Sequence, residues 1–169
     1  IPGVLEDATD IVLNLKQIRF KHHGDGPRTG LFQAVGEGVI KAGDMQISSD
    51  VEILNPDLHI ATINKDGELQ IEVEVATGRG YVTAEEHQKA GQRPLGTIVL
   101  DTNFSPITHV AYEVDAARVG QRIDFDKLVL DVSTDGSIVP QDALAMTAKL
   151  LRDHFNLFVT FEEKFEEEE

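Results

Sequence analysis

The chain has 169 residues, no cysteine and a formal net charge of −15. This length can bury one core or two small ones, and a chain without cysteine forms neither disulfides nor thiolate metal sites, which fits a reducing cytoplasm. The excess of acids disfavours direct binding to nucleic acid, since affinity for phosphate comes from lysine and arginine, and no apolar run is long enough to cross a membrane.

The first half of the chain has the pattern of one short helix followed by strands. Apolar residues at helical spacing after Glu6 and Asp7 predict a helix, whose N-terminus these carboxylates would stabilise through the helix dipole. Residues 22–30 are rich in glycine and are predicted to form a loop. Residues 69–75 alternate apolar and polar side chains, so that strand should have one buried and one acidic face. Further strands are predicted near 18–22, 31–35, 51–54 and 59–63, with a hairpin turn at 64–67.

The second half begins with a polar stretch, 83–94, which has no periodic pattern and is predicted to be a mobile loop. Asp135 and Gly136 should end the last strand, and Pro140 suits the first turn of a following helix. That helix is predicted to run from 143 to 158. Strands are predicted at 97–100, 107–114 and 128–132.

The predicted C-terminal helix carries a wide apolar stripe. Its members recur at alternating spacings of four and three residues, as one face of a helix requires. A helix wedged into a core would explain such a stripe, and so would a helix that covers its own sheet and also meets a partner subunit. The stripe consists of Leu144, Ala148, Leu151, Phe155 and Phe158.

The segment from 113 to 128 is the most densely charged part of the folded region. Arg118 and Arg122 are four residues apart, and Asp124 lies close by, before Lys127. This mixture is too polar for a core and too compact for a linker, so it indicates a segment held on a rigid scaffold and offered to a macromolecular partner. A solvated network of ion pairs within the chain is the alternative, because such pairs are common and stabilise proteins little.

Asp124 and Asp126 also raise the possibility of a metal-dependent enzyme. Two carboxylates at i and i+2 on a strand share one face and are suitable ligands for a divalent metal. Lys127 follows directly, Arg122 can neutralise one acid, and no third acidic ligand is adjacent, so paired surface charges are the better interpretation. We therefore expect no metal and no cofactor. A free-standing module that binds a charged peptide is a further alternative.

Three blocks of the sequence resemble motifs of the bacterial RNA polymerase alpha subunit. The segment 113–128 is similar to a signature that reads roughly A-x-R-V-x-Q-R-T-D-x-D-K-L, with Phe125 in place of a usual leucine. Residues 78–82 resemble R-G-R-G-Y-V, with Thr77 in place of a common arginine. Residues 104–112 resemble Y/F-S-P-V-x-x-V-A-Y/F. The resemblance extends over about residues 1–158 and keeps the order and spacing of the blocks.

This resemblance implies an α+β fold with two subdomains. Residues 1–104 would form an insert subdomain of mostly antiparallel strands. Residues 105–160 would form the remainder of a sheet-plus-helix dimerisation subdomain, and 161–169 a disordered acidic linker stub. By the same resemblance, the chain is expected to be an internal piece that lacks the family's first segment and its C-terminal DNA-binding domain.

The implied function is that of a non-catalytic scaffold in a nucleotidyltransferase complex. Two alpha subunits dimerise and recruit the beta and beta-prime subunits, and the domain itself binds neither nucleic acid nor membrane. By similarity, Lys16 and Leu100 face beta, and the apolar helix stripe takes part in the alpha dimer. The residues that face beta-prime by similarity are Arg118, Arg122, Asp124 and Lys127.

Overall fold

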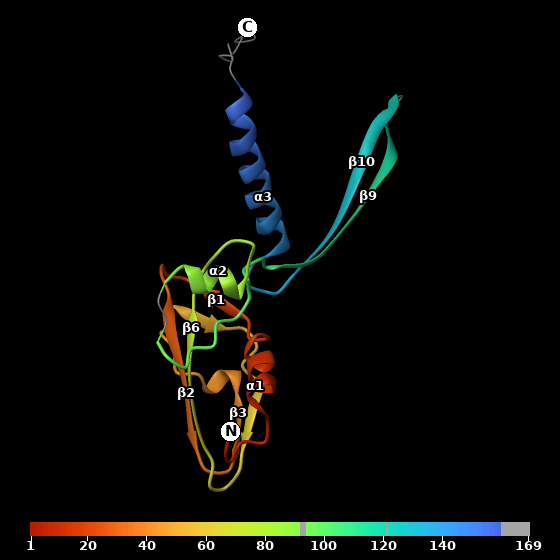
Figure 1. The fold of residues 1–169 in the computed structure, drawn as a ribbon. Helices are drawn as coiled ribbons and strands as arrows, with labels where there is room; N and C mark the ends of the chain where they lie inside the picture. The colour runs from red at the N-terminus through yellow and green to blue at the C-terminus, as the bar shows by residue number, and fades with distance from the viewer. Residues whose placement is uncertain (92–93, 121, 160–169) are drawn as a thin grey trace. The chain divides into compact units, whose positions relative to one another are not determined.

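The computed structural model describes residues 1–91, 94–120 and 122–159, and it confirms the predicted α+β class (Figure 1). The chain divides into two compact units. Unit 1 contains Ile1–Pro106 and Asp135–Ser137, and unit 2 contains Ile107–Thr134 and the described residues from Ile138 onward. The expected linker stub at 161–169 lies outside the described residues.

Unit 1 holds a series of short elements. Its helices are α1 (Ala8–Leu15), the 3₁₀ turn η1 (Ala42–Asp44) and α2 (Ala84–Lys89). Its strands are β1 (Phe20–His22), β2 (Arg28–Val35), β3 (Gly38–Lys41), β4 (Val51–Ile53), β5 (His59–Ile63), β6 (Glu68–Val75), β7 (Tyr81–Val82) and β8 (Thr102–Asn103). The strands pair antiparallel as β1 with β4, β2 with β6, β3 with β5, and β7 with β8.

The predicted hairpin around 64–67 is wrong, although the turn itself is present. The Gly67 amide donates to the Asn64 carbonyl at 2.9 Å. The strands on either side of this turn, β5 and β6, pair with β3 and β2 instead of with each other. The turn therefore carries the chain from one two-stranded sheet to the other. Strands of both sheets contribute apolar side chains to a single core. This core forms without a hairpin between β5 and β6.

The core of unit 1 lies between these two sheets and α1. Phe32 of β2 and Ile60 of β5 are 1% and 0% exposed, and Ile11 of α1 is 3% exposed. Burial of each such side chain contributes about 1.5–3 kcal/mol. As predicted, α1 begins after acidic residues: Asp7 accepts hydrogen bonds from the amides of Thr9 and Asp10 and so caps the helix. β6 alternates exposed acids with more buried apolar residues, also as predicted.

Two predictions in the segment from 83 to 100 are wrong. Part of the expected loop forms α2, because Thr83 and Glu86 make reciprocal capping hydrogen bonds at its N-terminus. Residues 97–100 are not a strand, and the strand of this region is the shorter β8, which pairs with β7. Residues 92 and 93 lie outside the described part of the chain.

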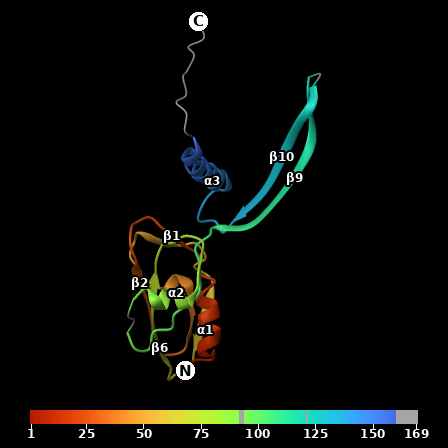
Figure 2. The ribbon, with the colours of Figure 1, turned by 45° about the horizontal axis from the view of Figure 1, so that its top comes forward.

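Unit 2 contains a two-stranded antiparallel ribbon and a helix (Figures 1 and 2). The ribbon consists of β9 (Ile107–Val119) and β10 (Arg122–Thr134), so the charged segment lies on its distal part, around the turn between the strands. The helix α3 (Pro140–Phe155) continues into a 3₁₀ turn, η2 (Asn156–Phe158). Pro140 occupies the first turn of α3, as predicted, and Gly136 has a φ of 95° beyond the end of β10.

One carboxylate fixes the N-terminal segment to the core of unit 1. Glu6 accepts hydrogen bonds from the Thr62 amide at 2.7 Å, the Thr62 hydroxyl at 3.1 Å and the His59 ring at 2.7 Å. Desolvation alone would raise the pKa of Glu6, but these hydrogen bonds outweigh it and lower the pKa from 4.5 to about 2. Ionised Glu6 therefore stabilises the fold above pH 4.5, and this contribution is lost as the pH falls towards 2.

We expect Glu6→Gln to lower the free energy of unfolding at pH 7 by up to about 3 kcal/mol, the value that corresponds to this pKa difference. Urea denaturation between pH 7 and pH 2.5 should show the difference between the variant and the parent chain shrinking below pH 4.5. Glu68→Gln, at an exposed position, is the matched control and should leave the free energy of unfolding almost unchanged. If Glu6→Gln lowered the free energy of unfolding equally at every pH, the stabilising role of the ionised Glu6 carboxylate would be contradicted.

Candidate functional site

The pairing of β9 with β10 gives the ribbon two unlike faces. Pairs such as Tyr112 with Leu130 and Val114 with Leu128 lie on one face, which is therefore mainly apolar. Pairs such as Asp115 with Lys127 lie on the opposite face, which is more polar. The apolar face is accessible in this chain: Tyr112 is 76% exposed.

The distal end of the ribbon carries the predicted charged residues. The register shifts between Arg122 and Phe125, so two residues of β10, at 123 and 124, lie across from Arg118 of β9. Such a bulge redirects side chains and increases the local twist. Arg118 also donates from Nε to the Gly120 carbonyl at 2.9 Å.

Of the residues predicted to face beta-prime, the structure brings two together and places Lys127 apart from them. Arg118 and Asp124 lie across from each other at the bulge, and Asp126 is on the same face as Asp124. Lys127 is on the opposite face, paired in register with Asp115. The backbone of Arg122 pairs with Val119, and its side chain lies outside the described parts of the structure.

The apolar stripe of α3 is largely exposed. Leu144 and Leu151 are 50% and 55% exposed, Phe155 is 63% exposed, and Phe158, which lies in η2, is 79% exposed. Ala148 is exposed as well. A row of large apolar side chains that water can reach is typical of a surface that another protein element covers.

The two predicted beta-facing residues both belong to unit 1. Lys16 is the exposed C-cap of α1, and Leu100 is half-buried immediately before Asp101. The amide of Ala84 donates to Asp101 at 2.8 Å, and this hydrogen bond is the main cause that lowers the pKa of Asp101. The charge of Lys16 lowers that pKa further. Sequence reasoning singled out Lys16 and Leu100 but missed Asp101.

Two of the family-like sequence blocks meet in space. A Cβ atom added to Gly78 would come within 2.5 Å of the Phe104 ring, so only glycine leaves room for that ring. The Phe104 amide donates to the Gly80 carbonyl at 2.8 Å, and Gly80 has a φ of 64°. The contact gives a physical reason for a glycine at 78 beside an aromatic ring at 104 in this chain.

Gly78→Ala should therefore lower the free energy of unfolding by about 1–3 kcal/mol, because the Phe104 ring or the backbone must move. Gly38→Ala is the matched control, since its added Cβ would meet nothing within 4 Å. Chemical denaturation of both variants measures the effect. Equal stability of the two would show that the Phe104 ring moves aside at no cost.

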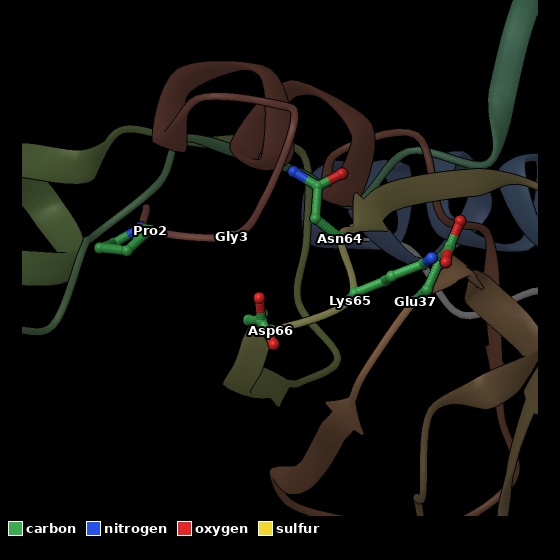
Figure 3. A pocket seen from close by; sticks show the side chains of 7 residues that line it. Pro2, Gly3, Glu37, Asn64, Lys65 and Asp66 are labelled. Atoms are coloured by element: carbon green, nitrogen blue, oxygen red, sulfur yellow. The ribbon is translucent and has the colours of Figure 1, made fainter.

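A cavity of about 570 Å³ opens near the turn that joins β5 to β6 (Figure 3). Its lining is Pro2, Gly3, Glu37, Asn64, Lys65, Asp66 and Gly67. None of these residues belongs to the predicted site. Within the described ranges, no group of three or more histidines and acids is arranged to hold a metal ion. No helix in those ranges is long and apolar enough to span a membrane.

Comparison with known proteins gives the family. A family model described as the RNA polymerase Rpb3/RpoA insert domain matches residues 1–105. The DNA-directed RNA polymerase subunit alpha of Alkaliphilus oremlandii is 50% identical over 160 residues, which are 95% of this chain and 50% of that protein. The same subunit of Nitratidesulfovibrio vulgaris is 48% identical over 164 residues, 97% of this chain and 47% of the relative. The subunit of Symbiobacterium thermophilum is 47% identical over 167 residues, which are 99% of this chain and 53% of that protein.

The chain spans about half the length of the curated relatives it matches. The similarity nevertheless runs through unit 1, the charged ribbon and α3, because it covers 95–99% of this chain. By identity, coverage and the match to the insert-domain model, the chain belongs to the bacterial RNA polymerase alpha subunit family.

Proposed function

We propose that this chain is a non-catalytic scaffold of DNA-dependent RNA polymerase, which dimerises and recruits the beta and beta-prime subunits. The observation that carries the proposal is the identity of 47–50% over nearly the whole chain with proteins named as alpha subunits. Such an enzyme works in the cytoplasm. The chain contributes surfaces to the assembly, and the chemistry of nucleotide addition takes place elsewhere in the complex.

Three separate surfaces carry the proposed contacts. Lys16 and Leu100 in unit 1 face beta. The distal end of the ribbon, with Arg118, Arg122, Asp124 and Lys127, faces beta-prime. The exposed stripe of α3 and η2 takes part in the alpha dimer, because its large apolar side chains are stabilised only when another element covers them.

Stepwise reconstitution tests this proposal. The full-length alpha subunit, mixed with purified beta and beta-prime, should give an alpha dimer, then a complex with beta, and then a complex that also contains beta-prime. Gel filtration separates these species. An alpha subunit that binds neither large subunit would refute the scaffold role.

The metal-dependent enzyme is not favoured by the relatives, which are named as polymerase subunits. It remains directly testable at Asp124 and Asp126. Calorimetric titration of the chain with Mg²⁺ should give no saturable binding. Nucleotide incorporation by the purified chain that is lost in Asp124→Asn would overturn the scaffold assignment, and binding of a free peptide without the large subunits would favour the third alternative.

A further inference from the structure

The turn from Gly78 to Gly80 follows β6, leads into β7 and carries one arginine between two glycines. Arg79 is exposed. Within residues 1–91, 94–120 and 122–159, its side chain takes part in no hydrogen bond or ion pair. The chain has 30 acidic side chains against 15 lysines and arginines, so acids that could pair with a guanidinium are plentiful. Arg79 is nevertheless left to solvent or to a partner.

One residue, Phe104, fixes the backbone on both sides of Arg79. A Cβ atom added to Gly78 would come within 2.5 Å of the Phe104 ring, so the ring packs directly against the Gly78 backbone. The Phe104 amide donates to the Gly80 carbonyl at 2.8 Å. Gly80 has a φ of 64°, which glycine adopts readily and other residues rarely adopt. The two glycines thus give the turn a defined shape, and Arg79 is the side chain that this turn presents.

Phe104 is itself held by its surroundings. The ring of His87, in α2, meets the Phe104 ring edge-on, with 6.4 Å between ring centres. The same histidine ring is 2.7 Å from the Thr102 hydroxyl of β8. β7 pairs with β8 directly after the turn, with Tyr81 opposite Asn103. A local framework of one helix and two paired strands therefore supports the turn.

A guanidinium on a fixed backbone is well suited to bind a carboxylate. Its planar N–H groups donate parallel hydrogen bonds to both carboxylate oxygens, a geometry that an ammonium does not match. A preformed turn also reduces the conformational entropy that is lost on binding. Arginine and tyrosine are enriched among the residues that dominate binding energy, and the nearby Tyr81 is 61% exposed. A merely solvated arginine would not need a turn that is fixed on both sides.

The location of the turn indicates which partner supplies the carboxylate. Its framework includes β8, which closely follows Leu100 in the chain. Leu100 is one of the residues proposed to face beta, so the turn and that surface are joined through a short stretch of chain. Nucleic acid is a less suitable ligand, because Glu85 and Glu86 begin α2 in the same segment and the net charge of −15 repels a polyanion.

We propose that Arg79 is a contact residue of the beta-facing surface and pairs with a carboxylate of the beta subunit, and that Gly78, Gly80 and Phe104 fix the turn that presents it. The inference rests on the proposed role of Lys16 and Leu100 in binding beta. It adds a third contact to that surface and names the chemistry of the partner group.

Titration of the full-length subunit with purified beta tests the contact. Arg79→Gln should weaken binding about tenfold, because the desolvated carboxylate loses its cation. Arg79→Lys should restore only part of the affinity, because a point charge does not reproduce the parallel hydrogen bonds. Lys65→Gln, which removes an exposed turn cation elsewhere in unit 1, is the control and should bind normally. Normal binding by Arg79→Gln, or full affinity in Arg79→Lys, would overturn the inference.

The role of the turn is tested with Gly78→Ala, which keeps the guanidinium but displaces the Phe104 ring or the backbone. Gly78→Ala alone should weaken binding to beta. In the Arg79→Gln background it should add little, because both changes then act on one contact. Gly38→Ala, whose added Cβ meets nothing within 4 Å, should leave binding unchanged in both backgrounds. Losses that multiply in the double variant would show that the turn does not act through Arg79, and this part of the inference would fail.

Nucleic acid as the ligand is tested by fluorescence anisotropy with labelled duplex DNA. The full-length subunit and its Arg79→Gln variant should bind this DNA equally. A loss in the variant would assign the guanidinium to phosphate and overturn the pairing with a carboxylate.

The variant Lys16→Met separates the inference from the function on which it rests. If Lys16→Met weakens binding to beta and Arg79→Gln does not, the beta-facing role of the surface stands and the role of Arg79 fails. If neither variant weakens binding, the surface does not face beta, and both assignments fail together.

Discussion

Arg118→Ala and Lys127→Ala, each made in the full-length alpha subunit, are expected to leave the alpha dimer intact and to block the capture of beta-prime. Both residues lie on the distal part of the β9–β10 ribbon, and neither belongs to the apolar stripe of α3. Loss of a charged contact that is desolvated in an interface costs about 2–5 kcal/mol, which weakens binding roughly 30-fold or more.

Gel filtration of reconstitution mixtures measures the effect, and an alpha–beta intermediate should accumulate. Lys65→Ala, which removes an exposed lysine of unit 1, is the control and should assemble normally. A normal yield of the complete complex from both ribbon variants would refute the beta-prime assignment.

The two variants also report on how beta-prime would bind the ribbon. Arg118 is at the bulge, on the face that carries Asp124, whereas Lys127 is on the opposite face. A partner that packs against one face would need only one of these residues. If both variants block assembly, beta-prime must contact both faces or wrap around the end of the ribbon.

Local sequence patterns correctly predicted α1 and β6, because neighbouring residues determine the start of this helix and the two faces of this strand. Asp7, one of the two acids before α1, caps this helix, and the alternation in β6 matches its exposed and more buried positions. The pairing of β5 with β3, and of β6 with β2, could not be predicted in this way. Pairing depends on which apolar faces meet in the core, and a turn at 64–67 is compatible with either arrangement.

The wrong predictions at 83–100 have a similar physical origin. The helix α2 is polar, so it has no apolar periodicity, and its local signals are the capping pair Thr83 and Glu86 and the acids in its first turn. The apolar run at 98–100 suggests a strand, yet Ile98 is 64% exposed and the pairing occurs at β8. In both cases hydrophobic burial is weak and hydrogen bonds decide the structure: the Thr83–Glu86 cap for α2 and the pairing with β7 for β8.

The candidate site was predicted in composition but not in arrangement. The charge density at 113–128 indicated a partner surface, but its arrangement depends on the strands: alternation along β10 places Lys127 on the opposite face from Asp124, and the register with its bulge sets Asp124 across from Arg118. Asp101 and Glu6 had no sequence signal, because their hydrogen-bond partners lie elsewhere in the chain, at Ala84 for Asp101 and at Thr62 for Glu6.

Phe155→Glu in the full-length alpha subunit is expected to convert the dimer to a monomer. Phe155 is 63% exposed on the α3 stripe, and the flanking Leu151 and Phe158 are exposed as well. Each large apolar side chain that a dimer buries contributes about 1.5–3 kcal/mol. The variant forgoes that contribution and would also have to bury a carboxylate without a partner, which costs several kcal/mol more.

Sedimentation equilibrium of the variant and the parent subunit measures the effect directly, and the dissociation constant of the dimer should rise at least a hundredfold, since about 3 kcal/mol or more is lost. Lys149→Glu is the matched control, because it adds negative charge to the same helix at an exposed position outside the stripe. The control should remain dimeric. If Phe155→Glu dimerises as tightly as the parent subunit, the stripe is satisfied within its own chain, and the dimer contact must lie on another surface.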